Sequence, residues 1–200
     1  MIDFTLSNCV NSGYRRIYLL TQFAASSLHR HVRRGWVPLL SDELGEFIEM
    51  VPAQRMAEDR WYAGTADAIY QNLFILQEER PSLVIILSGD HAYKMDYRGM
   101  VRQHLETGAA LTIASLKAPR EHCTQLGVLE VERDWRVAGF EEKPDDPRGV
   151  PDDPDHSLVS MGVYVWTTAE LVRRVADDAT RDTNHDFGKD LIPAMVSEGS

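Results

Sequence analysis

The sequence predicts an α/β fold with a mostly parallel sheet, and three observations support this class. The apolar run at residues 83–87 stops abruptly at Ser88-Gly89-Asp90, as a strand does when a sheet covers it on both faces. Around it, strand-like runs alternate with helical periodicity, which favours right-handed crossovers between parallel strands. From Gly127 onward two short strands flank a polar turn, which predicts an antiparallel hairpin.

The individual elements follow from the spacing of apolar residues and from the residues that end each segment. Apolar positions at helical spacing predict helices at residues 2–12, 23–34, 65–79, 97–106, 168–176 and 186–196. Short apolar or alternating runs predict strands at residues 15–21, 46–51, 83–87, 110–116, 128–131, 137–140 and 158–166. Gly13 and Gly108 are expected to end two of the helices in the left-handed conformation, and Asp186 is expected to cap the start of the last one. The Asp- and Pro-rich stretch at residues 144–155 predicts an exposed loop.

Composition places the chain among globular proteins of ordinary domain size. It has 200 residues, of which 44% are hydrophobic and 26% charged, and no linker divides it, so a single domain is expected over residues 1–200. There is no apolar run of the ~20 residues that span a bilayer and no secretory signal, so a cytoplasmic protein without a membrane partner is expected. Cys9 and Cys123 are too few for a disulfide scaffold and are expected to be reduced core residues.

Charge argues against a nucleic-acid partner. The formal net charge is −10, and an acidic surface repels a polyanion unless a basic stripe is reserved for it. One short basic cluster is present, at His29, Arg30, His31, Arg33 and Arg34. It fits either a solvated helix face or a patch that recognises the phosphate of a small ligand.

Asp90 is the first candidate site residue. In open α/β sheets ligands bind beyond the carboxyl ends of the strands, which is where Asp90 would lie. An ionised carboxylate there can bind the Mg²⁺ that accompanies a nucleotide phosphate. From the local sequence alone, capping of the next helix or closure of a turn is an equally good explanation.

Three further motifs suggest a ligand site, and each also has a structural explanation. Residues 61–68, WYAGTADA, place a small turn before a helix whose backbone N–H groups could approach a phosphate, although a simple helix start explains it as well. Glu142 and Lys143 could bind sugar hydroxyls and phosphate, or form a surface pair. Ser160 and Gly162 could contact a ligand or mark a strand bulge. A P-loop, GxGxxG fingerprint, serine-hydrolase elbow and Cys/His zinc cluster are absent.

The order of six motifs is far more specific than any one of them. IDFTLSNCVNSG, WYAGTADA, SGDHAYKMDY, FEEKP, LVSMGVYV and HDFGKDLIP occur in this sequence along the whole chain. Together they resemble the bacterial ADP-glucose pyrophosphorylases, also called glucose-1-phosphate adenylyltransferases. The resemblance implies the Rossmann-like fold of nucleotide-sugar pyrophosphorylases and a reaction of ATP with glucose 1-phosphate that gives ADP-glucose and pyrophosphate. It also implies Mg²⁺ as cofactor, a role in glycogen biosynthesis and a homo-oligomer, which is a homotetramer in the full-length family.

The same resemblance implies roles for individual residues. Catalytic roles fall to Asp90, as the Mg²⁺ ligand, and to Lys143, which would orient the attacking phosphate. The residues implied to bind glucose 1-phosphate are Tyr62, Gly127, Glu142, Lys143 and Ser160. The residues implied to bind the nucleotide are Gln22, Gly64, Thr65 and Ala66.

The chain also departs from the family pattern. A glycine-rich triphosphate loop, a second metal-binding aspartate and a C-terminal β-helix have no counterpart in residues 1–200, so the chain is expected to be the central part of the catalytic domain, truncated at both ends. Little or no catalysis is therefore expected from this chain alone. Two alternatives stay open, namely a pyrophosphorylase that uses another nucleoside triphosphate and a non-catalytic sugar-phosphate-binding or regulatory subunit.

Overall fold

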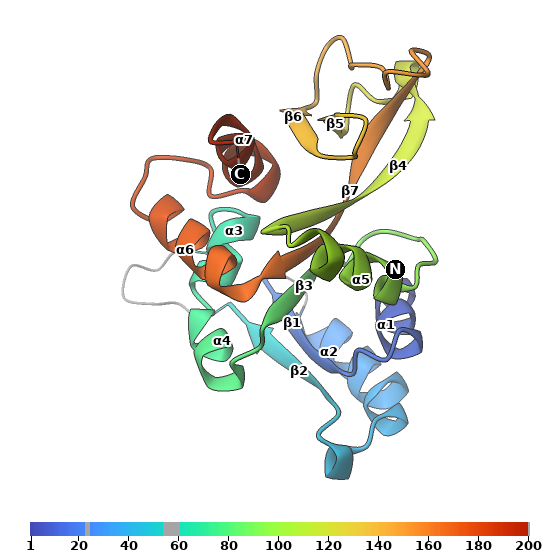
Figure 1. The fold of residues 1–200 in the computed structure, drawn as a ribbon. Helices are drawn as coiled ribbons and strands as arrows, with labels where there is room; N and C mark the ends of the chain where they lie inside the picture. Colours follow the sequence, from blue (N-terminus) through green and yellow to red (C-terminus); the bar gives the residue numbers. More distant parts are fainter. Residues whose placement is uncertain (23–24, 54–60, 200) are drawn as a thin grey trace. The chain divides into compact units, whose positions relative to one another are not determined.

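The computed structural model describes residues 1–22, 25–53 and 61–199 (Figure 1). The chain divides into two compact units. Unit 1 comprises Met1–Tyr62 and Gly89–Arg102, and unit 2 comprises Ala63–Ser88 and Gln103–Ser200. Helix α5 (Tyr97–Thr107) crosses the boundary between them.

Unit 1 is a two-stranded parallel sheet covered by helices. Its elements are α1 (Ile2–Asn11), β1 (Arg16–Thr21), α2 (Ala25–Gly35), the short 3₁₀ turns η1 (Val37–Leu39) and η2 (Asp42–Leu44), and β2 (Phe47–Pro52). Strands β1 and β2 pair in parallel from Arg16↔Phe47 to Thr21↔Pro52. Buried Leu6, Val32 and Ile48 join α1, α2 and β2 in one core.

The predicted end of the first helix is confirmed. Gly13 adopts φ +84, and its N–H donates to the carbonyl of Val10 at 3.1 Å. The next residue, Tyr14, donates to the carbonyl of Cys9 at 2.9 Å, so the last carbonyls of α1 are satisfied. Gly108 likewise follows α5 with φ +64.

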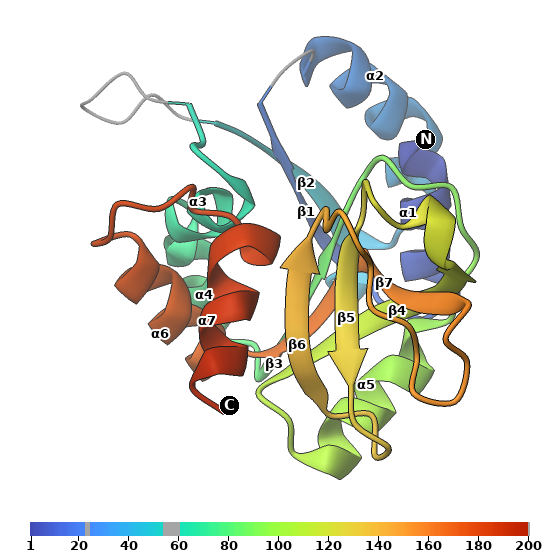
Figure 2. The ribbon, with the colours of Figure 1, turned by 90° about the horizontal axis from the view of Figure 1, so that it is seen from above.

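Unit 2 is built around an antiparallel sheet. Its helices are α3 (Thr65–Tyr70), α4 (Leu73–Glu79), η3 (Arg120–His122), α6 (Thr168–Asp178), the π-helical turn η4 (Phe187–Leu191) and α7 (Ile192–Ser197). Its strands are β3 (Leu83–Leu87), β4 (Leu111–Pro119), β5 (Gly127–Val131), β6 (Val137–Glu142) and β7 (His156–Thr167). Helix α7 lies beside β6 (Figure 2). The core of unit 2 centres on Trp166, Leu171, Phe187 and Ile192.

The long strand β7 is shared by three neighbours. Val165 pairs with both Ile85 of β3 and Thr112 of β4, so these two strands lie on opposite edges of β7. Further along, Val159 pairs with β4 and with β5, so one edge of β7 changes its partner from β3 to β5. The change falls at residues 160–163, where the register against β4 also shifts.

The α/β class is confirmed, but strand direction differs from the prediction. Among the described residues only β1 and β2 pair in parallel, whereas β3, β4 and β5 all run antiparallel to β7. The alternation of strands and helices predicts crossovers but does not say which strands become neighbours. The predicted hairpin is confirmed, since β5 and β6 pair antiparallel.

Two predicted helices are divided in the structure. The segment 65–79 breaks at Asn72, whose φ of −113 and ψ of 20 are not helical and whose side-chain amide donates to the carbonyl of Ala68 at 2.7 Å. The segment 186–196 begins with the turn η4 and continues as α7. Asp186 caps it as predicted, because its carboxylate accepts the N–H groups of Gly188 and Lys189.

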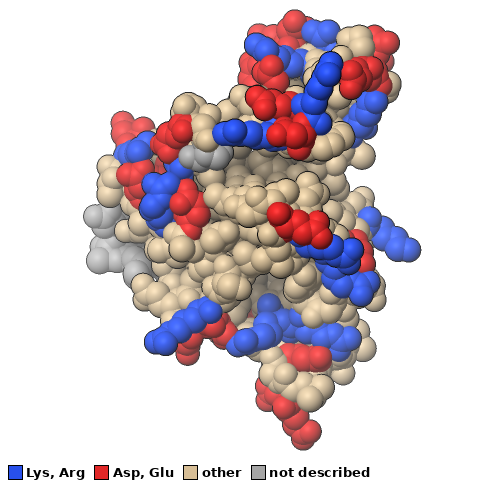
Figure 3. Space-filling model, viewed as in Figure 1, with Lys and Arg blue, Asp and Glu red and all other residues tan. Residues whose placement is uncertain are grey.

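The predicted loop 144–155 is held by ion pairs to β4, to β5 and to the turn η3. Arg120 pairs with Asp146 at 2.5 Å, Lys117 pairs with Asp153, and Arg148 pairs with Glu130 at 2.8 Å. Opposite charges accordingly intermingle around the tips of β4 and β5 (Figure 3). Cys9 and Cys123 are buried and unpaired, as predicted. No helix in the described part of the chain is long and apolar enough to cross a membrane.

Candidate functional site

Two sequence motifs more than 115 residues apart meet in unit 2. The N–H groups of Ala66 and Asp67 donate to the carbonyl oxygen of His185, at 2.8 and 3.2 Å. The Thr65 hydroxyl donates to Asp186 Oδ2 at 2.9 Å and accepts the N–H of Phe187 at 3.1 Å. The start of α3 is therefore joined to the start of η4.

Gly64 makes this junction sterically feasible. A Cβ atom at Gly64 would lie 2.3 Å from the carbonyl oxygens of both Asn184 and His185. No real Cβ approaches backbone oxygens so closely, so only glycine fits here. Its φ of −159 is extended, and the requirement for glycine comes from the close approach of the two backbones.

These contacts change how the motif at 61–68 can act. The N–H of Ala66 was a predicted donor to a phosphate, but it is engaged by the carbonyl of His185. The structural explanation, a helix start, is confirmed in outline: α3 begins at Thr65, with Gly64 rather than Thr65 as the N-cap residue. Binding of a nucleotide by Gly64, Thr65 and Ala66 stays a prediction, and it would have to use other atoms.

Glu142 lies over two glycines at the end of β6. Gly127 is its partner in the β5–β6 register, and a Cβ there would lie 2.9 Å from Glu142 Oε2 and 2.6 Å from Cζ of Phe140. A Cβ at Gly188 would lie 3.3 Å from the same carboxylate oxygen. Gly127 and Gly188 thus leave room for the carboxylate between the hairpin and η4.

Ser160 lies where β7 changes partners. The adjacent Gly162 has φ +63, and its N–H donates to Ser160 Oγ at 3.3 Å, so the strand-bulge explanation of this motif is confirmed. Burial raises the pKa of Tyr164, and the charges of Asp186 and Glu142 raise it further. The Ser160 side chain lies close enough to the Tyr164 hydroxyl to lower its pKa in part.

Lys143 follows Glu142 in a sparsely populated backbone conformation. Its φ is +53, and its N–H donates to the carbonyl of Leu126 at 3.0 Å. Non-glycine residues adopt positive φ infrequently, and such outliers gather at functional sites. The side chain is exposed, and within the described residues its ammonium group has no ion-pair partner.

Unit 2 therefore brings together several of the predicted site residues. Gly127 leaves room for Glu142, and the side chains of Glu142, Ser160 and Asp186 all influence the pKa of Tyr164. Thr65 is hydrogen-bonded to Asp186. Tyr164, Asp186 and Gly188 were not among the site residues predicted from the sequence. The signal for Asp186 was present in HDFGKD, but its capping role accounted for it first.

Asp90, Gln22 and Tyr62 belong to unit 1. Asp90 follows β3, and its side chain is 80% exposed, with Oδ1 3.7 Å from Nε2 of His91. The helix-capping alternative for Asp90 is wrong, because α5 begins seven residues later and Asp96 Oδ1 accepts the N–H of Arg98 in its first turn at 3.0 Å.

Helix α1 holds the loop that follows Asp90. The Asn8 amide donates to the carbonyl of Tyr93 at 3.0 Å, and its oxygen accepts the N–H of Met95 at 3.2 Å. Ser12 Oγ accepts the N–H of Tyr97 at 2.9 Å, where α5 starts. The first and third of the six motifs are thus joined by side-chain to backbone hydrogen bonds within unit 1.

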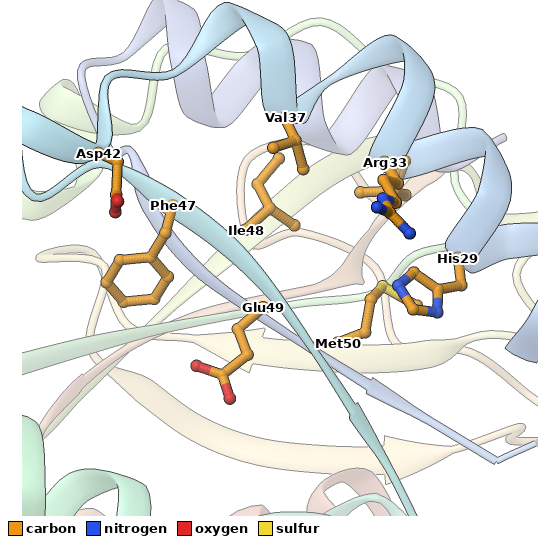
Figure 4. Close-up of a pocket in the computed structure, with 9 residues that line it drawn as sticks. His29, Arg33, Val37, Asp42, Phe47, Ile48, Glu49 and Met50 are labelled. Atoms are coloured by element: carbon orange, nitrogen blue, oxygen red, sulfur yellow. The ribbon is translucent and has the colours of Figure 1, made fainter.

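A pocket of about 510 Å³ lies between α2 and β2 in unit 1 (Figure 4). His29 and Arg33 of the basic cluster line it together with Met50 and Glu49 of β2. None of the residues implied to bind glucose 1-phosphate, the nucleotide or Mg²⁺ lines this pocket. Another member of the basic cluster, His31, has its Nε2 atom 2.6 Å from Asp3 Oδ1. The pKa of the Asp3 carboxyl is lowered first by the hydrogen bond from Trp36 and then by His31.

Comparison with known protein families gives the class of protein to which the chain belongs. The nucleotidyl transferase family matches residues 1–200, and the chain belongs to this family. Its sequence is 50% identical over 199 residues to a glucose-1-phosphate adenylyltransferase of Rhodopirellula baltica, covering 99% of this chain and 45% of that protein. It is 50% identical to glucose-1-phosphate adenylyltransferase 2 of Alkalilimnicola ehrlichii, over 99% of this chain and 47% of that protein.

A third relative extends the same similarity. Glucose-1-phosphate adenylyltransferase 2 of Vibrio cholerae is 46% identical over 201 residues, covering 100% of this chain and 49% of that protein. The resemblance inferred from the six motifs is confirmed. The chain spans about half the length of the curated relatives it matches.

Proposed function

We propose that the protein takes part in the transfer of an adenylyl group from ATP to glucose 1-phosphate, which gives ADP-glucose and pyrophosphate in glycogen biosynthesis. The observation that carries the proposal is the cluster in unit 2. There Glu142 lies between Gly127 and Gly188, and the charges of Glu142 and Asp186 both raise the pKa of Tyr164. The names of the relatives supply the substrates. Those names describe the relatives and not this chain, so the substrates are part of the proposal.

The cluster suits a sugar phosphate. A carboxylate accepts hydrogen bonds from sugar hydroxyls, and Glu142 Oε2 has space because glycines stand on two sides of it. The Lys143 ammonium, exposed and directly after Glu142, can pair with the phosphate. In this proposal Gly127, Glu142, Lys143, Ser160 and Tyr62 bind glucose 1-phosphate.

Further residues are assigned to the nucleotide and to the metal. Gln22, Gly64, Thr65 and Ala66 are proposed to bind ATP, and Asp90 is proposed to bind Mg²⁺. The described residues hold no cluster of three or more His, Cys, Asp or Glu side chains that could bind a metal ion. A single exposed carboxylate still fits Mg²⁺, which keeps several waters and is often held by one or two carboxylates and substrate phosphates. When bound, the ion would offset negative charge on the nucleotide.

The chemistry requires positioning more than covalent participation by the protein. A phosphate oxygen of glucose 1-phosphate attacks the α-phosphorus of ATP, and the bond to pyrophosphate breaks. Lys143 would orient the attacking phosphate and reduce its repulsion from the nucleotide. The carboxylate of Glu142 would fix the sugar ring.

Two measurements on the 200-residue chain test this proposal. Calorimetry with glucose 1-phosphate is expected to show binding. ADP-glucose with pyrophosphate and Mg²⁺ is expected to yield ATP, but far more slowly than with a full-length relative, since little catalysis is expected from this chain alone. Absence of both results would refute the proposal. Sugar-phosphate binding without turnover would favour the non-catalytic subunit.

A nucleotide panel in the same assay separates ATP from its rivals. Faster turnover of UDP-, dTDP- or GDP-glucose than of ADP-glucose would favour a pyrophosphorylase that uses another triphosphate. We further propose that the protein acts as a homo-oligomer. Sedimentation at several protein concentrations tests this, and a monomer at all of them would contradict it.

A further inference from the structure

The backbone at His185 is held in an unusual conformation in unit 2. His185 lies between α6 and η4 with φ +53, in the left-handed region that favours glycine. A conformation of this kind persists only where the surroundings stabilise it. The surroundings of His185 therefore show what the residue does.

The imidazole ring is anchored to α6. Nδ1 lies 2.8 Å from Asp178 Oδ2, and since a carboxylate only accepts hydrogen bonds, Nδ1 is the donor. Thr183 reinforces this contact, because its hydroxyl donates to Asp178 Oδ1 at 2.8 Å and accepts the N–H of His185 at 3.1 Å. The side chains of Asp178 and His185 are only 9% and 22% exposed.

The backbone of the same residue is anchored to α3. Its carbonyl oxygen accepts both N–H groups at the start of that helix, and its close approach excludes any residue but glycine at position 64. The next residue along the chain is Asp186, which caps η4 and accepts the Thr65 hydroxyl. The orientation of the His185 peptide thus determines where the Asp186 carboxylate lies relative to Tyr164 and Glu142.

We propose that His185 is a positioning residue for the sugar-phosphate site, acting through its hydrogen bonds to Asp178 and α3 to place Asp186 beside Glu142. The assignment rests on the proposed function, in which glucose 1-phosphate binds at Glu142. His185 itself does not touch the ligand. Its ring holds a strained backbone in the one orientation that joins the two motifs.

Three substitutions at His185 distinguish the effect of losing the ring from the effect of the positive φ. His185→Gly relieves the positive φ but removes the ring, and His185→Ala removes the ring and keeps the strain. His185→Asn tolerates positive φ and retains a side-chain N–H that can donate to Asp178. The control is His122→Ala, because His122 is exposed on η3 and touches none of these residues.

The test measures the affinity of the full chain for glucose 1-phosphate by calorimetry, at a temperature where thermal unfolding shows every variant folded. We expect His185→Gly and His185→Ala to weaken binding about tenfold, the scale of one lost supporting hydrogen bond. His185→Asn is expected to restore most of the affinity, and the control to match the wild type. Amide exchange at Ala66 and Asp67 is expected to rise in the Gly and Ala variants without any ligand.

The outcomes distinguish this inference from the proposed function. If the wild-type chain binds glucose 1-phosphate and His185→Gly binds it equally well, His185 is not a positioning residue. The same conclusion follows if His185→Asn binds as weakly as His185→Gly, because a side-chain hydrogen bond to Asp178 would then not support binding. If the wild-type chain binds no glucose 1-phosphate, the proposed function fails and the role of His185 at that site fails with it.

Discussion

Asn8 and Tyr93 are 85 positions apart in the sequence, and the Asn8 side-chain amide donates to the Tyr93 carbonyl at 3.0 Å. The amide oxygen of Asn8 accepts the N–H of Met95 at the same time. Asn8 is 95% buried, so both backbone groups depend on it rather than on water. The loop after Asp90 therefore takes its conformation from α1.

Replacing Asn8 by Leu is expected to lower the free energy of unfolding by about 2 kcal/mol, because two backbone groups lose their partner at a buried site. Denaturant unfolding measures this change. Asn11→Ala is the matched control, since Asn11 lies on the same helix, is exposed, and its amide donates to the Ser7 hydroxyl rather than to a backbone group. A cost for Asn11→Ala as large as that for Asn8→Leu would contradict the role of Asn8.

Gly64→Ala is expected to destabilise unit 2 by about 3 kcal/mol or more, because the added methyl group would collide with two backbone carbonyls that cannot move independently. Thermal unfolding of the variant measures the loss. Gly99→Ala serves as control, because nothing lies within 4 Å of a Cβ at that helical position, and it is expected to leave stability unchanged or to raise it. A Gly64→Ala variant as stable as the wild type would show that α3 and His185 do not approach as described.

Structural features that depend on residues close together in the sequence were predicted correctly. The glycines that end α1 and α5, the hairpin and the Asp186 cap all follow from side chains a few positions apart. Antiparallel pairing around β7 was missed because direction depends on which strands become neighbours. The bond between Thr65 and Asp186 was missed for the same reason, since local sequence carries no record of a partner 121 residues away.

His104 gives unit 2 a specific pH dependence. It is 1% exposed, with Nδ1 2.8 Å from Thr112 Oγ1 and Nε2 3.2 Å from Thr167 Oγ1. Burial lowers its pKa below the usual 6.5. The unfolded chain therefore binds a proton that the folded chain excludes, and stability falls as pH drops from 6.5 toward the lower folded pKa.

The difference between the wild type and His104→Gln isolates this effect. Other histidines and the carboxylates contribute equally to both proteins, so the difference in unfolding free energy between pH 7.5 and 5.5 reports His104 alone. We expect the wild type to lose more stability over this interval than the variant. Equal losses would mean that His104 gains its proton without cost in the folded state.

Glu142 and Glu141 allow the sharpest test of the sugar-phosphate site. They are neighbours in β6, and successive side chains of a strand point to opposite faces. Glu142 lies between Gly127 and Gly188, whereas Glu141 is exposed. Glu142→Gln keeps the shape of the side chain and removes its charge, and we expect it to weaken glucose 1-phosphate binding about tenfold, as when one charge-assisted hydrogen bond is lost. Glu141→Gln changes the net charge equally and is expected to bind as the wild type does. If calorimetry shows the two variants weakened to the same extent, the effect comes from overall charge, and the site does not lie at Glu142.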